Sequence, residues 1–213
     1  GAGRYHGPAL TALEPLRRSI QWMQDEHGIE TVLFAGDLLD GVNAKVQWEQ
    51  YCHSFDDQVA EAIRLLPRGP RYIGIYGNHD AWHSRENGMN MGVAITTAFR
   101  AAGRNDLELG RSMRRDFDFD GVIVRVEHPN GGTAYAKSYQ AQCMIRGMGT
   151  NPGMPHISLA GHRHSYVYAL ERGVRYVDVP CFQWPTSDYS KRNKNGETTV
   201  GGLVIAWQRG DNG

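Results

Sequence analysis

Three short peptides, far apart in the chain, end in side chains that could bind metal ions. They are Gly36-Asp37, Gly77-Asn78-His79-Asp80 and Gly161-His162-Arg163-His164, and a fourth candidate is His128. Each follows an apolar run of the kind that predicts a β-strand. Molecules and ions that bind to open α/β sheets do so at the carboxyl ends of the strands. One Asp, one Asn and three His at such ends supply the oxygen and imidazole ligands that two divalent ions require.

The first two peptides have distinct chemical uses. The two oxygens of Asp37 can each face one ion, although a Gly-Asp pair after a strand also serves to cap a turn. Asn78 offers a neutral, hard amide oxygen. His79 can point at a substrate instead, and Asp80 is expected to accept the proton of its other ring nitrogen and so fix its orientation. An Asx turn is the structural alternative for this peptide.

The histidines give a stronger signal in combination than alone. His162 and His164 are separated by one residue, so in an extended segment they point to the same side. Each of these peptides could be structural, and a lone His such as His128 at a strand end more often is. Four independent strand ends with compatible ligands favour a shared metal centre.

The surrounding pattern predicts alternating helices and strands, followed by mostly strands. We expect helices at 10–26, at 55–66 after a capping box of Ser54 and Asp57, at 91–102 and at 135–146. Pro15 is placed in a first turn and Gly28 at a helix end. Strands are expected at 31–35, 71–75, 114–119, 122–127, 156–160, 166–170, 174–179 and 200–207, with a hairpin turn at Asp120-Gly121.

This order of elements suits an α/β fold in which two sheets lie inside and helices lie outside. The 213 residues suit one domain, so we assign 1–213 to a single unit.

Lys+Arg and Asp+Glu number 23 each, and a net charge of zero provides no global field for nucleic acid. Small basic clusters at 111–115 and 191–194 fit solvated surface charge. Three cysteines without CxxC spacing indicate a reducing compartment. With no apolar run of ~18 residues and no signal-peptide pattern, we expect a cytoplasmic protein that does not enter membranes.

The ordered motifs Gly-Asp, Gly-Asn-His-Asp, a strand-end His and Gly-His-x-His resemble those of calcineurin-like metallophosphoesterases. The segment from His128 to Tyr135 and the peptide Pro180-Cys181-Phe182-Gln183 are similar to small single-domain members from phage and mobile elements. The resemblance implies a four-layer α/β/β/α sandwich of two mixed sheets flanked by helices, with a dinuclear site at the strand ends.

Residue roles follow from this resemblance. It implies that Asp37 bridges two ions and that Asn78, His128 and His162 complete the shell of the second. His164 would bind the first ion, and His79, backed by Asp80, would contact the phosphate and act on the leaving oxygen. The implied cofactors are two divalent ions; we expect manganese, with Mg, Fe or Zn as alternatives.

The family also opens with a strand that ends in Asp-x-His, and residues 1–8 hold no such motif. Three alternatives stand: a longer natural chain, which we favour, a rebuilt site, or lost catalysis. The expected gap in a sheet would expose backbone groups.

The predicted function is hydrolysis of phosphodiesters by metal-activated water, as a nuclease or nucleotide phosphodiesterase. The alternative is a non-catalytic or impaired scaffold or regulatory protein that binds one metal or none. A phosphomonoesterase acting on proteins is a weaker alternative. The expected partner is a phosphoester substrate, a nucleic acid or nucleotide among them. Tyr5, Trp82 and Trp184 are candidates to stack on bases, with ordinary packing as the alternative. The sequence makes no prediction of oligomeric state.

Overall fold

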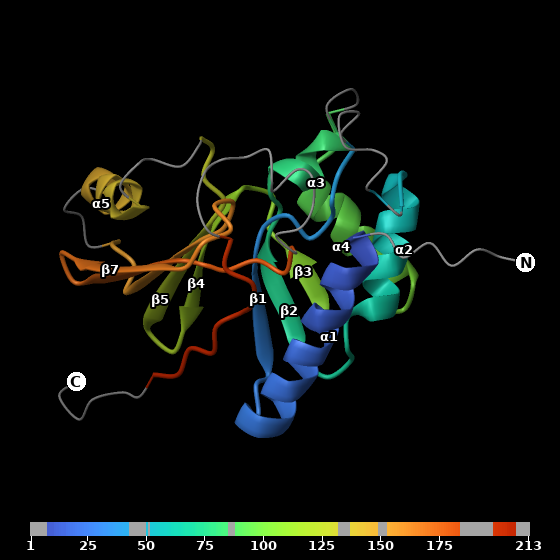
Figure 1. The fold of residues 1–213 in the computed structure, drawn as a ribbon, viewed down its shortest axis with the longest axis horizontal. Coiled ribbons are helices and arrows are strands. Elements are labelled where there is room, and N and C mark those ends of the chain that lie inside the picture. The colour runs from blue at the N-terminus through green and yellow to red at the C-terminus, as the bar shows by residue number, and fades with distance from the viewer. Residues whose placement is uncertain are drawn as a thin grey trace, which may run out of the picture.

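The computed structural model describes residues 8–42, 50, 52–84, 88–131, 137–148, 153–183 and 198–207. Its helices are α1 (Pro8–His27), α2 (Phe55–Leu65), α3 (Asn78–Trp82), α4 (Met91–Ala101) and α5 (Lys137–Gly147). Its strands are β1 (Thr31–Ala35), β2 (Arg71–Ile75), β3 (Leu107–Leu109), β4 (Arg114–Phe119), β5 (Val122–Glu127), β6 (Ile157–Ala160), β7 (Val167–Glu171) and β8 (Val174–Asp178) (Figure 1).

Two sheets bring the candidate residues to one edge. The first has the order β1-β2-β3 and is parallel, with Ala35 opposite Ile75. The second has the order β4-β5-β6-β8-β7, and its parallel β5 and β6 place Glu127 opposite Ala160. Since strands in register end together, the chain leaves β1 and β2 at one level, and likewise β5 and β6. The peptides that follow these four strands carry all the candidate ligands.

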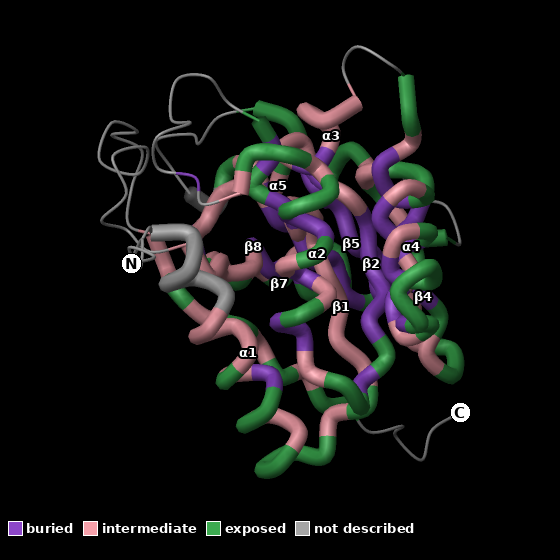
Figure 2. The backbone as a smooth tube through the Cα atoms, turned by 90° about the vertical axis from the view of Figure 1, so that its right-hand side faces the viewer, coloured by how far each residue is buried: buried purple, intermediate pink, exposed green. Residues whose placement is uncertain are grey.

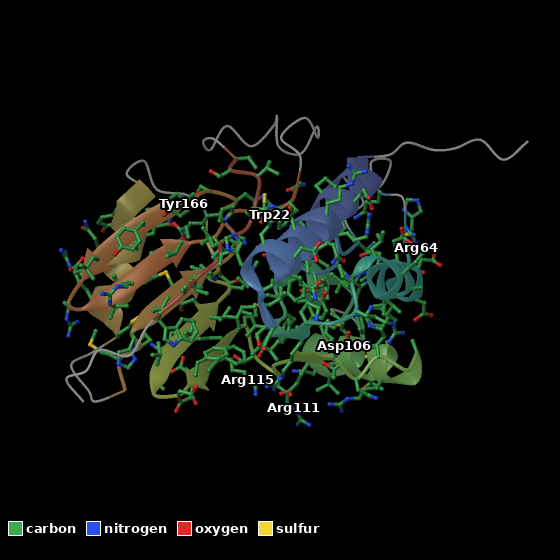
Figure 3. The ribbon with its side chains drawn as sticks, turned by 90° about the horizontal axis from the view of Figure 1, so that it is seen from below. Trp22, Arg64, Asp106, Arg111, Arg115 and Tyr166 are labelled. Carbon is green, nitrogen blue, oxygen red and sulfur yellow. The ribbon has the colours of Figure 1, made fainter. Side chains whose placement is uncertain are left out.

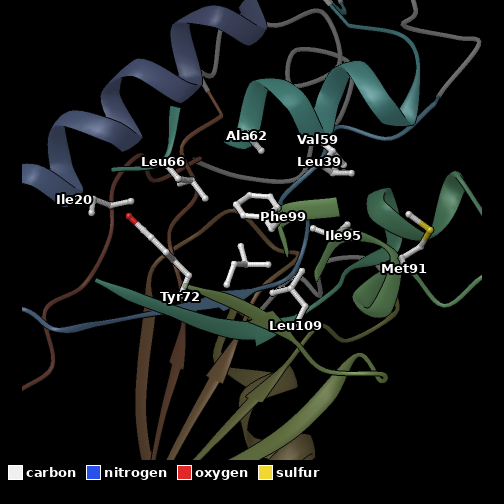
Figure 4. Close-up of a cluster of buried hydrophobic side chains, with 11 residues drawn as sticks. Ile20, Leu39, Val59, Ala62, Leu66, Tyr72, Met91, Ile95, Phe99 and Leu109 are labelled. Carbon is white, nitrogen blue, oxygen red and sulfur yellow. The ribbon is translucent and has the colours of Figure 1, made fainter. Parts of the chain in front are cut away.

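Three hydrophobic clusters separate four layers. Helices α1, α2 and α4 cover the first sheet through residues such as Ile20, Tyr72 and Phe99 (Figure 4). A second cluster, which includes Ile75 and Val126, lies between the sheets, and the third joins α5 to the second sheet. The buried segments run through β2 and β5 (Figure 2). The predicted α/β/β/α sandwich is therefore confirmed, although the first sheet is wholly parallel in the described residues and not mixed.

Local sequence signals account for several element boundaries. Ser54 Oγ accepts a hydrogen bond from the Asp57 amide (3.1 Å) and caps α2, as predicted. Asp120-Gly121 forms the predicted hairpin turn with φ of 54° and 87°. Positive φ at both turn positions is typical of a type I′ turn, which matches the twist of the flanking strands.

Other boundaries differ from the predictions. Helix α1 begins at Pro8, so Pro15 lies inside it and not in its first turn. The helical amphipathic pattern, which buries Ile20, outweighs the backbone hydrogen bond that proline cannot donate. Strand β3 and the single-turn α3 were not predicted, because three to five residues are too short for a periodic pattern.

The strand predicted at 200–207 is not formed. Val200 makes one isolated bridge to Cys181, and residues 201–207 have no strand partner among the described residues. Burial still alternates along this segment, and Leu203 and Ile205 pack on the cluster between the sheets. The hydrophobic pattern of a strand is therefore present, but the neighbour that would accept its hydrogen bonds is not in the described part of the chain.

A groove of about 490 Å³ lies beside this segment. It runs along β1, whose only strand partner in the described residues is β2, and Leu203 and Ile205 also line it. Within the described residues, no helix combines the length and apolar character that crossing a bilayer requires.

Candidate metal centre

Four side-chain atoms from four strand ends converge in the structure. Asn78 Oδ1 lies 2.8 Å from both His128 Nε2 and His162 Nδ1. Asp37 Oδ2 lies 3.1 Å from His128 Nε2. Ligand atoms about 2.1 Å from a shared ion and at right angles around it are about 3.0 Å apart. The spacing of these four atoms therefore fits one metal-coordination shell.

The outer hydrogen bonds of the two imidazoles show which nitrogen carries the proton. His128 Nδ1 donates to the Ala35 carbonyl (2.8 Å), and His162 Nε2 donates to the Gly131 carbonyl (3.0 Å). A carbonyl oxygen only accepts, so in each neutral ring the inward nitrogen presents a lone pair. Ring nitrogens fixed in this way by a carbonyl are typical of metal-binding histidines.

Without an ion, hydrogen bonds satisfy this cluster only if His128 is protonated on both ring nitrogens. If the Asn78 amide nitrogen faced inward, it could donate to both rings. The Asp37 carboxylate would still face the lone pair of His128 Nε2 across 3.1 Å. Either a proton on His128 or a cation must separate these two groups, and a divalent cation also satisfies Asn78 and His162.

The pKa values of the clustered side chains are shifted by burial and by their closeness to one another. Burial opposes the charged form of both partners, but the mutual attraction of Asp37 and His128 outweighs it: the pKa of Asp37 is lowered and that of His128 is raised. Burial lowers the pKa of His162, and the neighbouring His128 lowers it further. The imidazole of His162 therefore stays neutral and keeps a lone pair that can bind a cation.

The backbone is strained at three of the five predicted ligands. Asp37, His162 and His164 have φ of 54°, 78° and 53°, in the left-handed region that residues other than glycine seldom adopt. In the described residues the only other non-glycine cases are Asp120 and Arg172, each beside a glycine in a hairpin. Strain held outside ordinary turns is typical of functional sites.

His79 and Asp80 lie beside the cluster, but the expected bond between them is not formed. Asp80 is fully buried and accepts from the Leu39 and Gly77 amides (2.8 and 2.7 Å). His79 Nδ1 instead donates to the Asp40 carbonyl (3.0 Å). The prediction of an Asp80–His79 pair was wrong, because Asp80 faces inward, where it holds the loops after β1 and β2 together. Burial, and then the charge of Asp37, raise the pKa of Asp80 to about 6.

Asp40 is a residue beside the candidate site that the motif analysis missed. Its carbonyl orients His79, and its carboxylate accepts from Gln50 Nε2 (3.0 Å). A second Asp three residues after Asp37, followed by Gly41, was the available signal. His79 is also tied to Asp37, whose Oδ1 accepts its amide (2.8 Å).

His164 lines the same groove and does not join the four convergent atoms. Burial lowers the pKa of His164 to about 4, against the opposing charge of Asp37, so its ring is neutral at physiological pH. Among the described residues, Asp37, His128 and His162 form the only group of three acidic, His or Cys side chains close enough to hold an ion. Asp37 and His164 both line the groove beside this cluster.

The residues proposed to stack on bases, and those of the two basic clusters, lie only in part within the described residues. Trp82 packs against the His79 ring, with centroids 4.0 Å apart. Tyr5, Trp184 and the basic cluster at 191–194 lie outside the described residues. Arg111 and Arg115 lie on the same side of the molecule (Figure 3), where Arg115 pairs with Glu108 at 2.9 Å. This pairing fits solvated surface charge.

Gly77 offers a steric test of the cluster. A Cβ at this position would collide with the Asp37 carboxylate, while Gly77 itself has an ordinary extended backbone. We expect Gly77→Ala to displace Asp37 and weaken Mn²⁺ binding by about 10–100-fold, the range found when the surroundings of a ligand are disturbed. Isothermal titration measures this affinity.

Gly153→Ala is the matched control, because a Cβ there meets no atom within 4 Å. Equal Mn²⁺ affinity in the two folded variants would show that Asp37 does not contribute to an ion site.

Comparison with known families identifies the family to which the fold belongs. The sequence profile of the family described as calcineurin-like phosphoesterase matches residues 10–166. The chain belongs to this family. No curated protein matches the chain.

Similar solved structures include an archaeal phosphodiesterase, with 16% identity and a TM-score of 0.47 over 81% of this chain and 77% of that one. A hypothetical protein of Pyrococcus horikoshii shows 12% identity and a TM-score of 0.49 over 83% and 73%. A protein of Thermus thermophilus shows 10% identity and a TM-score of 0.43 over 83% and 86%.

Proposed function

We propose that this chain is a metal-dependent phosphodiester hydrolase whose principal ion is held by Asp37, Asn78, His128 and His162. The observation that carries the proposal is the convergence of four lone-pair donors, two of them imidazoles whose protons are directed outward. Membership of the calcineurin-like phosphoesterase family supports the reaction type.

Divalent ions supply two things in such a site: they lower the pKa of a bound water, and they neutralise charge on phosphoryl oxygens. The protein's part is to place the groups around them. Asp37 and Asn78 provide hard oxygens, and the loops that carry them are joined by Asp80. The Asp40 carbonyl and the Trp82 ring hold His79. We assign to its protonated ring the contact with the phosphate and the protonation of the leaving oxygen.

The second ion is proposed to bind between Asp37 and His164. Both line the groove, and Asp37 Oδ1 already accepts the His79 amide while keeping a further lone pair. Two protein ligands make a weaker site than four. This imbalance also favours the rival function, a scaffold that binds one ion and turns over no substrate.

Hydrolysis of a generic substrate separates these functions. We expect Mn²⁺-dependent release of nitrophenol from bis(p-nitrophenyl) phosphate, faster than from p-nitrophenyl phosphate, and lost with EDTA. A monoester preference would support the phosphomonoesterase alternative. Bound Mn²⁺ without turnover of either compound would support the scaffold.

Nucleic acids and nucleotides are the proposed natural substrate class. A net charge of zero argues against tight binding to long duplexes, so short strands and cyclic nucleotides are the first compounds to assay.

A further inference from the structure

Arg163 separates the two candidate histidines of the loop after β6, and its side chain points into the protein. The side chain is only 7% exposed. His162 and His164, on either side, both have left-handed φ. A loop with this backbone requires contacts that hold it, because each left-handed residue is disfavoured by itself.

The Arg163 guanidinium is held by two residues of β8. Nη1 donates to the Tyr176 hydroxyl (2.6 Å) and to Asp178 Oδ1 (2.5 Å), and the same hydroxyl donates to Asp178 Oδ1 (2.7 Å). Tyr176 and Asp178 are two residues apart on one face of the strand and are 0% and 1% exposed. Two short bonds from Arg163 thus connect the His-bearing loop to β8, and the hydroxyl bond joins the two β8 residues to each other.

The geometry of this pair differs from that of the partly buried pair of Arg125 and Asp116. Arg125 and Asp116 meet side by side, with Nε to Oδ1 and Nη2 to Oδ2 both at 2.7 Å. Arg163 meets Asp178 through Nη1 alone, and its Nη2 donates to Met144 Sδ (3.5 Å). Its Nε and Asp178 Oδ2 are buried and have no hydrogen-bond partner among the described residues. A pair that served stability alone would favour the two-bond arrangement, since buried unpaired polar atoms are unfavourable. The position of Arg163 is therefore set by the loop that carries it.

The backbone around Arg163 is fixed on two further sides. The Gly161 amide donates to the Glu127 carbonyl on β5 (3.0 Å), and the Thr199 amide donates to the His164 carbonyl (2.8 Å). These bonds hold the ends of the loop, and only the Arg163 side chain reaches β8 from its middle.

We propose that Arg163, Tyr176 and Asp178 form a positioning clamp that orients His162 and His164 toward the metal centre without touching the ion or the substrate. The proposal rests on the proposed function, because it assigns both histidines to that centre. Its consequence is that metal affinity depends on a hydrogen-bonded group buried behind the second sheet.

The test measures Mn²⁺ affinity in variants of the clamp. Tyr176→Phe removes the hydroxyl that joins the other two residues and preserves the packing. Arg163→Met removes the charge and keeps a flexible apolar chain. We expect both to weaken Mn²⁺ binding by about 10–100-fold. Arg163→Lys, which can restore a single-nitrogen contact, should bind more tightly than Arg163→Met.

Arg125→Met is the matched control, since it breaks an ion pair of the same sheet that does not touch the loop. We expect it to lower the melting temperature and leave the Mn²⁺ affinity within about twofold. Equal affinity losses in Arg163→Met and Arg125→Met, or an unchanged affinity in Tyr176→Phe, would overturn the clamp. Mn²⁺ affinity is measured without substrate. If the wild-type protein bound Mn²⁺ but hydrolysed nothing, the proposed function would be wrong, and the affinities of the variants would still test the clamp.

Hydrogen exchange provides a second measurement that needs no ion. Amides of residues 161–166 should exchange faster in Tyr176→Phe than in Tyr168→Phe, whose tyrosine is exposed on β7. Equal exchange in the two variants would reject the clamp, even if the wild-type protein bound no Mn²⁺.

Discussion

Asp37→Asn is expected to remove most Mn²⁺ binding. Asp37 supplies the only carboxylate in the group of three potential ligands that the described residues bring together. Asn is nearly isosteric but neutral, and it places an amide that donates, or a weaker oxygen, beside His128. Because disturbing a residue behind a ligand already costs about 10–100-fold, removal of the ligand charge should lower the affinity by more than about 100-fold.

Thermal stability measures the same effect. An ion present at about 100 times its Kd stabilises the wild-type fold by about 2.7 kcal/mol, and this Mn²⁺-dependent shift should vanish in Asp37→Asn. Asp25→Asn, an exposed change on α1, should keep the full shift. A preserved shift in Asp37→Asn would place the bound ion elsewhere in the protein.

His79→Ala has the second large expected effect, on turnover and not on metal binding. His79 Nδ1 donates to the Asp40 carbonyl, so the proton that the ring can give to a leaving oxygen is the one that Nε2 carries in the doubly protonated ring. Transfer of this proton to the leaving oxygen raises the reaction rate by about 10²–10⁴-fold. We expect kcat on bis(p-nitrophenyl) phosphate to fall by about that factor, with Mn²⁺ affinity within about threefold of wild type.

His79→Asn keeps a side-chain donor for Asp40 but cannot transfer a proton, so its kcat should fall as far as that of His79→Ala. Substitution of the exposed His53 should leave kcat unchanged. If His79→Ala lost Mn²⁺ binding together with turnover, the imidazole would serve to support the metal centre and not to act on the substrate.

The sequence predicted the positions of the site residues better than their contacts. Strand ends are marked by apolar runs that stop at Gly36, Gly77 and Gly161, and parallel pairing places such ends together. The convergence of Asp37, Asn78, His128 and His162 follows from that rule. The partner of Asp80 does not follow from it. The Asp80 carboxylate accepts from the Leu39 and Gly77 amides, and no local pattern distinguishes these contacts from a bond to the His79 ring.

Long-range contacts account for the remaining differences. The clamp joins Arg163 to residues 13 and 15 positions later, and no local pattern marks an arginine that is to be buried. The segment 201–207 has the alternating pattern of a strand and is not one, because strand formation also depends on a neighbour. Pattern alone reports which face of a segment is apolar, and pairing is decided by the rest of the fold.

The measurement that tests the central claim most directly is the metal content of the protein after Mn²⁺ loading and desalting, by elemental analysis. The four convergent donors predict at least one ion per wild-type chain and none in Asp37→Asn. A second ion would be assigned to the pair of Asp37 and His164. A wild-type chain that retained no ion would contradict a metal centre at these strand ends.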